Sequence, residues 1–334
     1  MSLIELCFVY SFYNKYINID INMDIKMNIH EVKSLLSELC INVFNFINDN
    51  NISTHHGCRH IVQVMLLCGK LFEDYQELTL FKKFIILAAT LLHDIDDKKF
   101  FSTTDYENAR TCIRSINSIS SSTEESIIEI IKYTSTKNIS LSSTETVLDH
   151  WKLIVSIADK LNAIGVEGVV RCYEFGRDKN RAIVTNETVR ASTNDEIMSQ
   201  VFEERYLAYT RGEQTNLQTY STLDHYYDKL LHIKRIAYLW LNISEDKNDL
   251  SSSTNIFKYI DELHDDLLRF VSYVDSVRDK QNCELLVNEY IDQCKVQIGW
   301  NDTIKYSLSE NPTLVLDLLN ECLGIEDLVY SFQT

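Results

Sequence analysis

The 334-residue sequence contains one proline and only eight glycines. Turn-rich β-sandwiches and barrels need many more of these residues, because glycine and proline supply the backbone conformations of tight turns. Their scarcity, together with 45% hydrophobic residues, favours a mainly helical protein with a sizeable core. The length allows either one large domain or two smaller ones.

Clusters of Lys and Arg are also absent, and the formal net charge is −17. Duplex nucleic acids and anionic membrane surfaces are bound by grouped positive charge, so neither partner is expected. No apolar run approaches the roughly 20 residues that span a bilayer. Residues 3–13 are apolar but lack a basic segment before them and a small-residue cleavage site after them, so no signal peptide is expected. A small phosphorylated substrate is compatible with this charge if a metal supplies positive charge locally.

The nine cysteines are scattered and form no CxxC motif. Their odd number and their position in apolar stretches indicate reduced core thiols and not a disulfide framework. The expected location is therefore the cytoplasm, which is intracellular and reducing.

Apolar residues recur at helical spacing along most of the chain, which predicts an all-α protein. Helices are predicted over 29–48, 56–73, 80–94, 105–118, 124–134, 147–164, 165–176, 197–211, 222–242, 256–298 and 313–331. Residues 1–27 are expected to be a poorly defined N-terminal segment, 28–243 the main domain and 244–334 a C-terminal helical extension. Within the main domain, 177–195 is polar without periodicity and is interpreted as a surface insertion or lid.

A His-Asp pair, His93-Asp94, directly follows the apolar run 84–92. Burying an ionisable pair is costly unless a cation or another partner compensates for it. His60 lies on the apolar helix before this pair, and Asp159 on an apolar helix after it. Each residue alone has an ordinary explanation, since a buried His is most often a hydrogen-bonded core residue. Two imidazoles and two carboxylates on separate apolar helices, however, suit a divalent metal that activates water.

Four sequence blocks, in this order, resemble the HD-domain metal-dependent phosphohydrolases. The pattern H-D-x-x-H-x-x-R-V is matched by 56–64, L-H-D-I by 92–95, A-D-R-L-D-A-I-G by 158–165, and H-F-x-x-K-L-L by 225–231. The similarity is greatest to the stand-alone bacterial-type enzymes, some of which hydrolyse nucleoside triphosphates to the monophosphate and pyrophosphate. The resemblance covers about residues 28–240. It implies an HD-domain helical bundle over 28–243.

The resemblance implies the following metal ligands: His60, His93, Asp94 and Asp159. His55 or His56 is an alternative to the first of them. One divalent metal is expected. Mn²⁺, Mg²⁺, Ni²⁺, Co²⁺ and Fe²⁺ all suit this mixed set better than a structural zinc, which usually has thiolate ligands, and Mn²⁺ is favoured.

Further site residues are assigned by the same resemblance. Asp94 is expected to contact both the metal and the attacking water, and Asp97 is a candidate acid/base. The candidates for binding the phosphates are Lys98, His225 and Lys229. A solvated charged loop is the alternative interpretation for Asp97, Lys98 and Lys99. A helix-face pair four residues apart is the alternative for 225 and 229.

Four positions depart from the pattern. Gly57 stands in place of an acid, Gln63 and Lys160 in place of a guanidinium, and Asn162 in place of a second acid. The two uncharged replacements, Gln63 and Asn162, are consistent with a lost ion pair, with a shifted substrate preference or with a partly decayed site.

The leading hypothesis is a metal-dependent phosphohydrolase acting on a nucleotide-like substrate, with hydrolysis of a (deoxy)nucleoside triphosphate to the monophosphate and pyrophosphate as the implied reaction. A phosphodiesterase or 5′-nucleotidase on the same site is an alternative, as is a non-catalytic nucleotide-binding or scaffold protein. A di-iron oxygenase is disfavoured, because it needs extra His ligands between His93 and Asp159, where only His150 lies. A homo-oligomer is compatible with the sequence. No role is assigned to the remaining histidines, His30, His150, His232 and His264.

Overall fold

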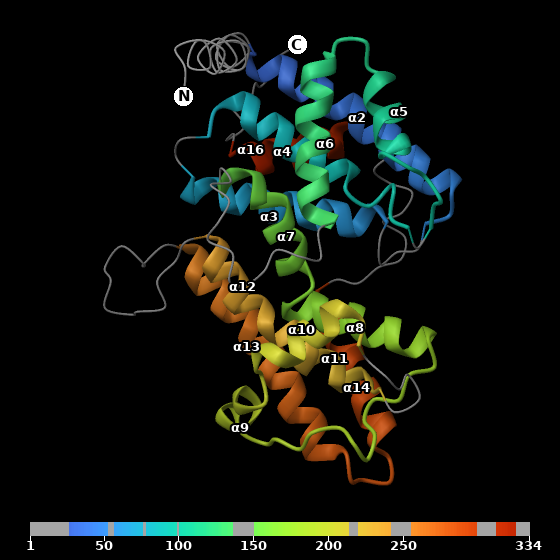
Figure 1. Cartoon of the computed structure of the whole chain (residues 1–334), viewed down its shortest axis with the longest axis vertical. Coiled ribbons are helices and arrows are strands. Elements are labelled where there is room, and N and C mark those ends of the chain that lie inside the picture. Colours follow the sequence, from blue (N-terminus) through green and yellow to red (C-terminus); the bar gives the residue numbers. More distant parts are fainter. Residues whose placement is uncertain are drawn as a thin grey trace, which may run out of the picture.

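The computed structural model describes residues 27–52, 57–75, 78–98, 100–135, 150–213, 220–241, 255–298 and 312–324. Every regular element in these ranges is a helix, which confirms the all-α prediction. The helices form two groups along the long axis of the molecule (Figure 1). Within the described ranges, no helix combines the length and the apolar composition needed to cross a bilayer.

The first group holds six α-helices, with α4 at its centre, together with a short 3₁₀ turn before α7. Its members are α2 (Ile29–Asp49), α3 (Cys58–Asp74), α4 (Leu80–Leu92), α5 (Glu107–Arg114), α6 (Ser121–Ser135), η2 (His150–Leu153) and α7 (Ile154–Asn162). The second group is α8 (Gly165–Asp178), α9 (Asn194–Ser199), α10 (Glu203–Arg211), α11 (Thr222–Asp228), η3 (Leu230–His232), α12 (Ile233–Trp240), α13 (Asn255–Val277) and α14 (Cys283–Gln297). The last helix, α16 (Pro312–Leu323), returns to the first group (Figure 1).

The central helix of the first group is α4. Its N-cap is Thr79, whose hydroxyl accepts a hydrogen bond from the Lys82 amide. Ten of its thirteen residues are buried, in agreement with its nearly uniform apolar sequence. It packs against α2, α3, α6 and α7. Its C-terminal end, where the His-Asp pair follows, is therefore held firmly in the core.

The helices of the C-terminal extension pack against helices of the preceding part of the chain. Helices α13 and α14 lie against α8, and α16 lies against α2 and α3. The approach of α16 to α3 depends on a glycine, because a Cβ at Gly69 would lie 2.9 Å from the Cα of Cys322. The boundary at residue 244 stays a prediction, but the extension contacts both groups of helices.

Arg278, which directly follows α13, is one of the residues that attach the segment 177–195 to the end of this helix. Arg278 donates hydrogen bonds to the carbonyl oxygens of Thr185, Thr188 and Val189 at 3.1, 3.0 and 2.8 Å. These bonds satisfy backbone groups of a segment that has no regular structure of its own between α8 and α9. A lid function for this segment stays a prediction.

Three segments that were each predicted to form one continuous helix are interrupted in the structure, so these predictions were wrong. The range 197–211 contains α9 and α10, 222–242 contains α11, η3 and α12, and 256–298 contains α13 and α14. One break lies at Lys229, whose φ of −133° and ψ of −60° are not helical. Apolar periodicity continues across such a break, because the chain resumes with its apolar side still toward the core.

Candidate metal centre

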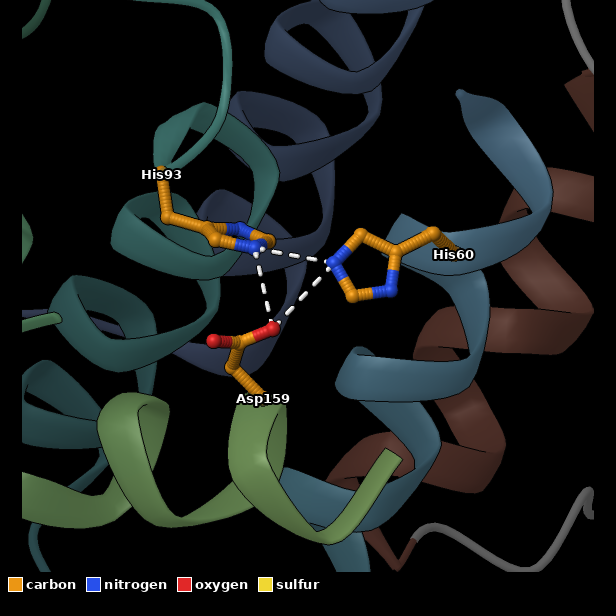
Figure 2. A group of neighbouring side chains, drawn as sticks. All are labelled: His60, His93 and Asp159. Carbon is orange, nitrogen blue, oxygen red and sulfur yellow. Dashed lines mark hydrogen bonds and ion pairs between the residues drawn. The ribbon is translucent and has the colours of Figure 1, made fainter. Parts of the chain in front are cut away.

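Three helices bring the side chains of His60, His93 and Asp159 together (Figure 2). His60 lies in the first turn of α3, His93 is the C-cap of α4, and Asp159 is in α7. One potential ligand atom from each residue lies within 4.8 Å of the others. Both histidines are buried, whereas 33% of the Asp159 side chain is exposed, so the group faces solvent on the side of α7.

The carboxylate of Asp94 completes this group. Its Oδ2 lies 3.4 Å from Nε2 of His60, and its Oδ1 lies 3.6 Å from Nε2 of His93. Oδ1 of Asp159 lies 3.3 Å and 3.9 Å from the same two nitrogens. Nε2 of each imidazole thus lies within 4.0 Å of both carboxylates, while a role as metal ligands stays a prediction for these four residues. The carboxyl end of α4 adds partial negative charge, which favours a cation there.

Hydrogen bonds fix the tautomers of both imidazoles. Nδ1 of His93 lies 2.7 Å from the Thr90 carbonyl oxygen, and Nδ1 of His60 lies 2.7 Å from Oδ1 of Asn162. Both oxygens accept hydrogen bonds, so each Nδ1 carries the proton and each Nε2 keeps its lone pair. The two Nε2 atoms lie only 3.2 Å apart, yet neither can donate to the other. This convergence of lone pairs and carboxylates fits a metal ion.

Electrostatic interactions also favour a positive charge at this point. Burial and the charge of Arg171 lower the pKa of His60, but the carboxylates of Asp159 and Asp94, which would accept hydrogen bonds from a protonated ring, outweigh them, and the net pKa is raised. Burial alone would raise the pKa of Asp159, but interaction with protonated His60 and His93 rings lowers it well below its usual range. Asp159 is therefore ionised at neutral pH, as a metal ligand must be.

The loop residues assigned to the site follow the ligands directly. The amide of Asp97 donates to the Asp94 carbonyl at 3.1 Å, so Asp97 lies in the turn after the His-Asp pair. Lys98 is exposed. The roles of Asp97 as acid/base and of Lys98 as a phosphate ligand stay predictions. The alternative ligands, His55 and His56, lie outside the described residues.

Of the two predicted phosphate-binding residues, His225 is on α11 and Lys229 is the C-cap of that helix, and Lys229 lies near Lys160 of α7. Burial lowers the pKa of Lys160, which directly follows Asp159, to about 8. The charge of Asp159 opposes this shift, and the charge of Lys229 adds to it. Burial and the charges of Lys229 and Arg181 hold the pKa of His225 well below its usual value. His225 is thus a neutral hydrogen-bonding group and not a cation at neutral pH.

The structure adds Lys160 and Arg181 to Lys229, and these three residues are called the cationic group below. The guanidinium of Arg181 lies 5.2 Å from the centroid of the Tyr220 ring, and the Lys160 amino group lies 4.7 Å from that of Trp240. Among the described residues, no carboxylate lies within 4.0 Å of the charged nitrogens of the cationic group. These three positive charges lie together in a chain whose formal net charge is −17.

Arg171 is a second residue that sequence analysis missed. It lies on α8, and its guanidinium contacts Oδ1 of Asn162, the atom that also accepts from His60. Burial lowers the pKa of Arg171, while the nearby carboxylates of Asp159 and Asp94 raise it. Its only signal in the sequence is a charged residue after the apolar pair Val169-Val170, which alone does not indicate a site.

The fold and these side chains define an all-α protein with a candidate divalent-metal centre built from imidazoles and carboxylates. No family model matches the chain. It is 32% identical over 216 residues to protein L803 of Acanthamoeba polyphaga mimivirus, whose name describes it as uncharacterized. The matched region covers 62% of this chain and 86% of that protein. The chain belongs to the same family as mimivirus protein L803.

Three solved structures with approximate similarity in fold come from bacteria. One is a protein of Lactobacillus plantarum, at 17% identity, a TM-score of 0.49 and coverage of 73% of this chain and 96% of that one. A second is an HD-superfamily hydrolase of Bacillus thuringiensis, at 18% identity, a TM-score of 0.48 and coverage of 75% and 100%. The third is Bacillus subtilis YpgQ in complex with ADP, at 17% identity, a TM-score of 0.45 and coverage of 73% and 99%.

Proposed function

We propose that this chain is an HD-superfamily metal-dependent phosphohydrolase that acts on a nucleotide-like small molecule. One observation carries the proposal: Nε2 atoms of His60 and His93 converge with the carboxylates of Asp94 and Asp159, with no donor between the two nitrogens. These are the residues at which the sequence matches the HD pattern. The match of motif and geometry supports a single divalent metal, of which Mn²⁺ suits the mixed nitrogen and oxygen ligands.

Each side chain has a distinct part in this centre. The Thr90 carbonyl holds His93 in its ligating tautomer, and Asn162 does the same for His60. Asp94 faces both imidazoles and is placed to orient the water that attacks phosphorus. A divalent metal bound here would lower the pKa of water and polarise a phosphoryl oxygen. The exposed side of Asp159 is the direction from which the substrate would approach.

The cationic group supports a substrate with several phosphates. Lys160 adjoins the ligand Asp159, and Lys229 interacts electrostatically with both Lys160 and His225. Arg181 interacts with His225 in turn, so positive charge extends outward from the metal centre. We therefore propose hydrolysis of a (deoxy)nucleoside triphosphate to the monophosphate and pyrophosphate, with the distal phosphates bound by the cationic group.

The test is turnover of a panel of nucleotides by the purified full chain with Mn²⁺, with Mg²⁺ and with a chelator. Pyrophosphate and orthophosphate are measured separately. Metal-dependent release of pyrophosphate from a triphosphate is the expected result. Release of orthophosphate from monophosphates, or cleavage of a phosphodiester, would replace the proposed reaction by a nucleotidase or a phosphodiesterase. Bound metal without turnover of any substrate would contradict an enzymatic function on nucleotides.

Replacing Lys229 by Met is expected to raise KM for the triphosphate by about tenfold or more, because charge-assisted hydrogen bonds to phosphate contribute roughly 1.5–3 kcal/mol each. The dissociation constant of Mn²⁺ measured without substrate should change little, since Lys229 is not a ligand. Lys258→Met is the matched control, because this lysine is 83% exposed and pairs only loosely with Glu262. An unchanged KM in Lys229→Met would remove Lys229 from the substrate site.

A further inference from the structure

The side chain of Asn162 is held at both ends of its amide. Oδ1 accepts a hydrogen bond from Nδ1 of His60 at 2.7 Å and a second one from Nη1 of Arg171. Nδ2 donates to Oε1 of Gln63 at 3.2 Å. Asn162 itself is buried, so these protein groups replace water as its partners.

The guanidinium determines which way this amide points. Oxygen and nitrogen of an Asn side chain have nearly the same shape, so the orientation must follow from the hydrogen-bonding partners. Arg171 has only donors, so the Asn162 atom that it contacts must be the oxygen. The same oxygen then requires His60 to carry its proton on Nδ1, which leaves Nε2 free to face the other proposed ligands. A flipped amide would present a donor to Nδ1 and favour the opposite tautomer.

We propose that Arg171 is a positioning residue of the metal centre, which fixes the Asn162 amide and thereby holds His60 in the tautomer that can bind metal. This inference rests on the proposed metal centre. The guanidinium comes from α8, whereas His60 and Gln63 are on α3 and Asn162 ends α7. The contact thus makes the state of a ligand depend on the packing of three helices.

An Asn at position 162 needs the contact with Arg171 to keep its oxygen toward His60, whereas an Asp at this position does not. Both oxygens of an Asp side chain are acceptors, so an Asp at position 162 would hold His60 in the required tautomer in either orientation. An Asn presents an acceptor in only one of its two orientations. Removing Arg171 should therefore matter when residue 162 is Asn and matter much less when it is Asp.

The positive charge of Arg171 provides a second way to distinguish a positioning role from a purely electrostatic one. Arg171 lies close enough to Asp94 and Asp159 for their charges to raise its pKa against the effect of burial. If the positive charge were its main effect on the site, removing it would tighten the binding of a cation. If positioning dominates, removing it loosens binding. The two roles predict opposite signs.

The experiment measures Mn²⁺ binding to the full chain by titration calorimetry, without substrate, for wild type, Arg171→Met, Asn162→Asp and the double variant. Arg171→Met is expected to weaken binding by about 10- to 100-fold, the usual effect of losing a group that orients a ligand. In the Asn162→Asp background the same change should cost less than about threefold. Arg177→Met is the matched control, because this arginine is 60% exposed on the same helix and pairs with Glu174.

A second readout does not depend on metal. Nitrogen-15 spectra of the histidines in metal-free protein at alkaline pH report which ring nitrogen carries the proton. His60 should change from Nδ1–H toward a mixture of tautomers in Arg171→Met and stay Nδ1–H in the double variant. An unchanged tautomer, tighter Mn²⁺ binding, or an equal loss in both backgrounds would overturn the positioning role. Failure of wild type to bind Mn²⁺, with the tautomer change intact, would instead refute the metal centre alone.

Discussion

The Asp94→Asn variant is expected to bind no Mn²⁺ at concentrations that saturate wild type and to lose turnover to the background level. Each oxygen of Asp94 faces one of the two imidazoles, at 3.4 Å from Nε2 of His60 and 3.6 Å from Nε2 of His93. The amide keeps the size of the side chain but lacks its charge and presents a donor to one of the two nitrogens. Since loss of an outer partner alone lowers metal affinity by about 10- to 100-fold, loss of a ligand should exceed that.

The metal-free fold should survive this substitution. Asp94 follows the last turn of α4, and its side chain is 18% exposed, so no core volume is lost. We therefore expect an unchanged melting temperature without metal and no increase on adding Mn²⁺, whereas wild type is stabilised by the metal it binds.

The matched control is His150→Ala. His150 is exposed, its Nδ1 contacts the Trp240 carbonyl at 3.1 Å, and it is not one of the proposed ligands. This variant should keep wild-type metal stoichiometry and turnover. A full complement of Mn²⁺ and wild-type turnover in Asp94→Asn would refute the assignment of the site.

The sequence was sufficient to predict the class of the fold and to single out four residues whose side chains lie close together in the structure. The apolar run 84–92 requires a buried helix, and an ionisable His93-Asp94 pair at its end requires a compensating partner. Because burying charge has a large cost, the His93-Asp94 pair alone predicted a contact with residues distant in the sequence. The same reasoning placed Asp159 on an apolar helix, and the structure brings it within 3.3 Å of His60.

The sequence did not predict the interruptions of the helices or the role of Arg171, and these two failures have separate causes. Periodicity records which side of the chain faces the core, and this side is retained across the non-helical backbone of Lys229. Arg171 contacts Asn162 through a turn between α7 and α8, and the angle of that turn depends on tertiary packing. The sequence shows that Gln63 and Asn162 depart from the HD pattern, but it does not show that their side chains form a hydrogen bond with each other.

Acidification is expected to destabilise the folded protein, because two histidines are buried in neutral form. Burial lowers the pKa of His232 to about 4 against the effect of its hydrogen bond to the Tyr227 carbonyl. Burial and the charge of Lys234 lower the pKa of His264, also to about 4. Among the described residues, Nε2 of His264 has no hydrogen-bond partner, so a proton placed there would have no acceptor.

The sign of the effect follows from proton binding in the two states. An unfolded histidine titrates near pH 6.5, so below that pH the unfolded chain takes up protons that the folded chain refuses until about pH 4. The free energy of unfolding is therefore complete above about pH 6.5 and falls as the pH is lowered through this window. Each histidine contributes a loss of about 2 kcal/mol by pH 5, since one pKa unit corresponds to about 1.4 kcal/mol.

Urea denaturation of metal-free protein between about pH 7.5 and pH 5 measures the loss in the free energy of unfolding. Comparison with His264→Leu isolates the contribution of His264. The raised pKa of His60 works in the opposite direction, but it is present in both proteins and cancels in the difference. Relative to wild type, His264→Leu should gain about 2 kcal/mol between these pH values, because leucine has no proton to take up in either state. His30→Leu, at an exposed position of α2, should show the pH dependence of wild type. Parallel pH profiles for wild type and His264→Leu would show that His264 does not resist protonation in the folded chain.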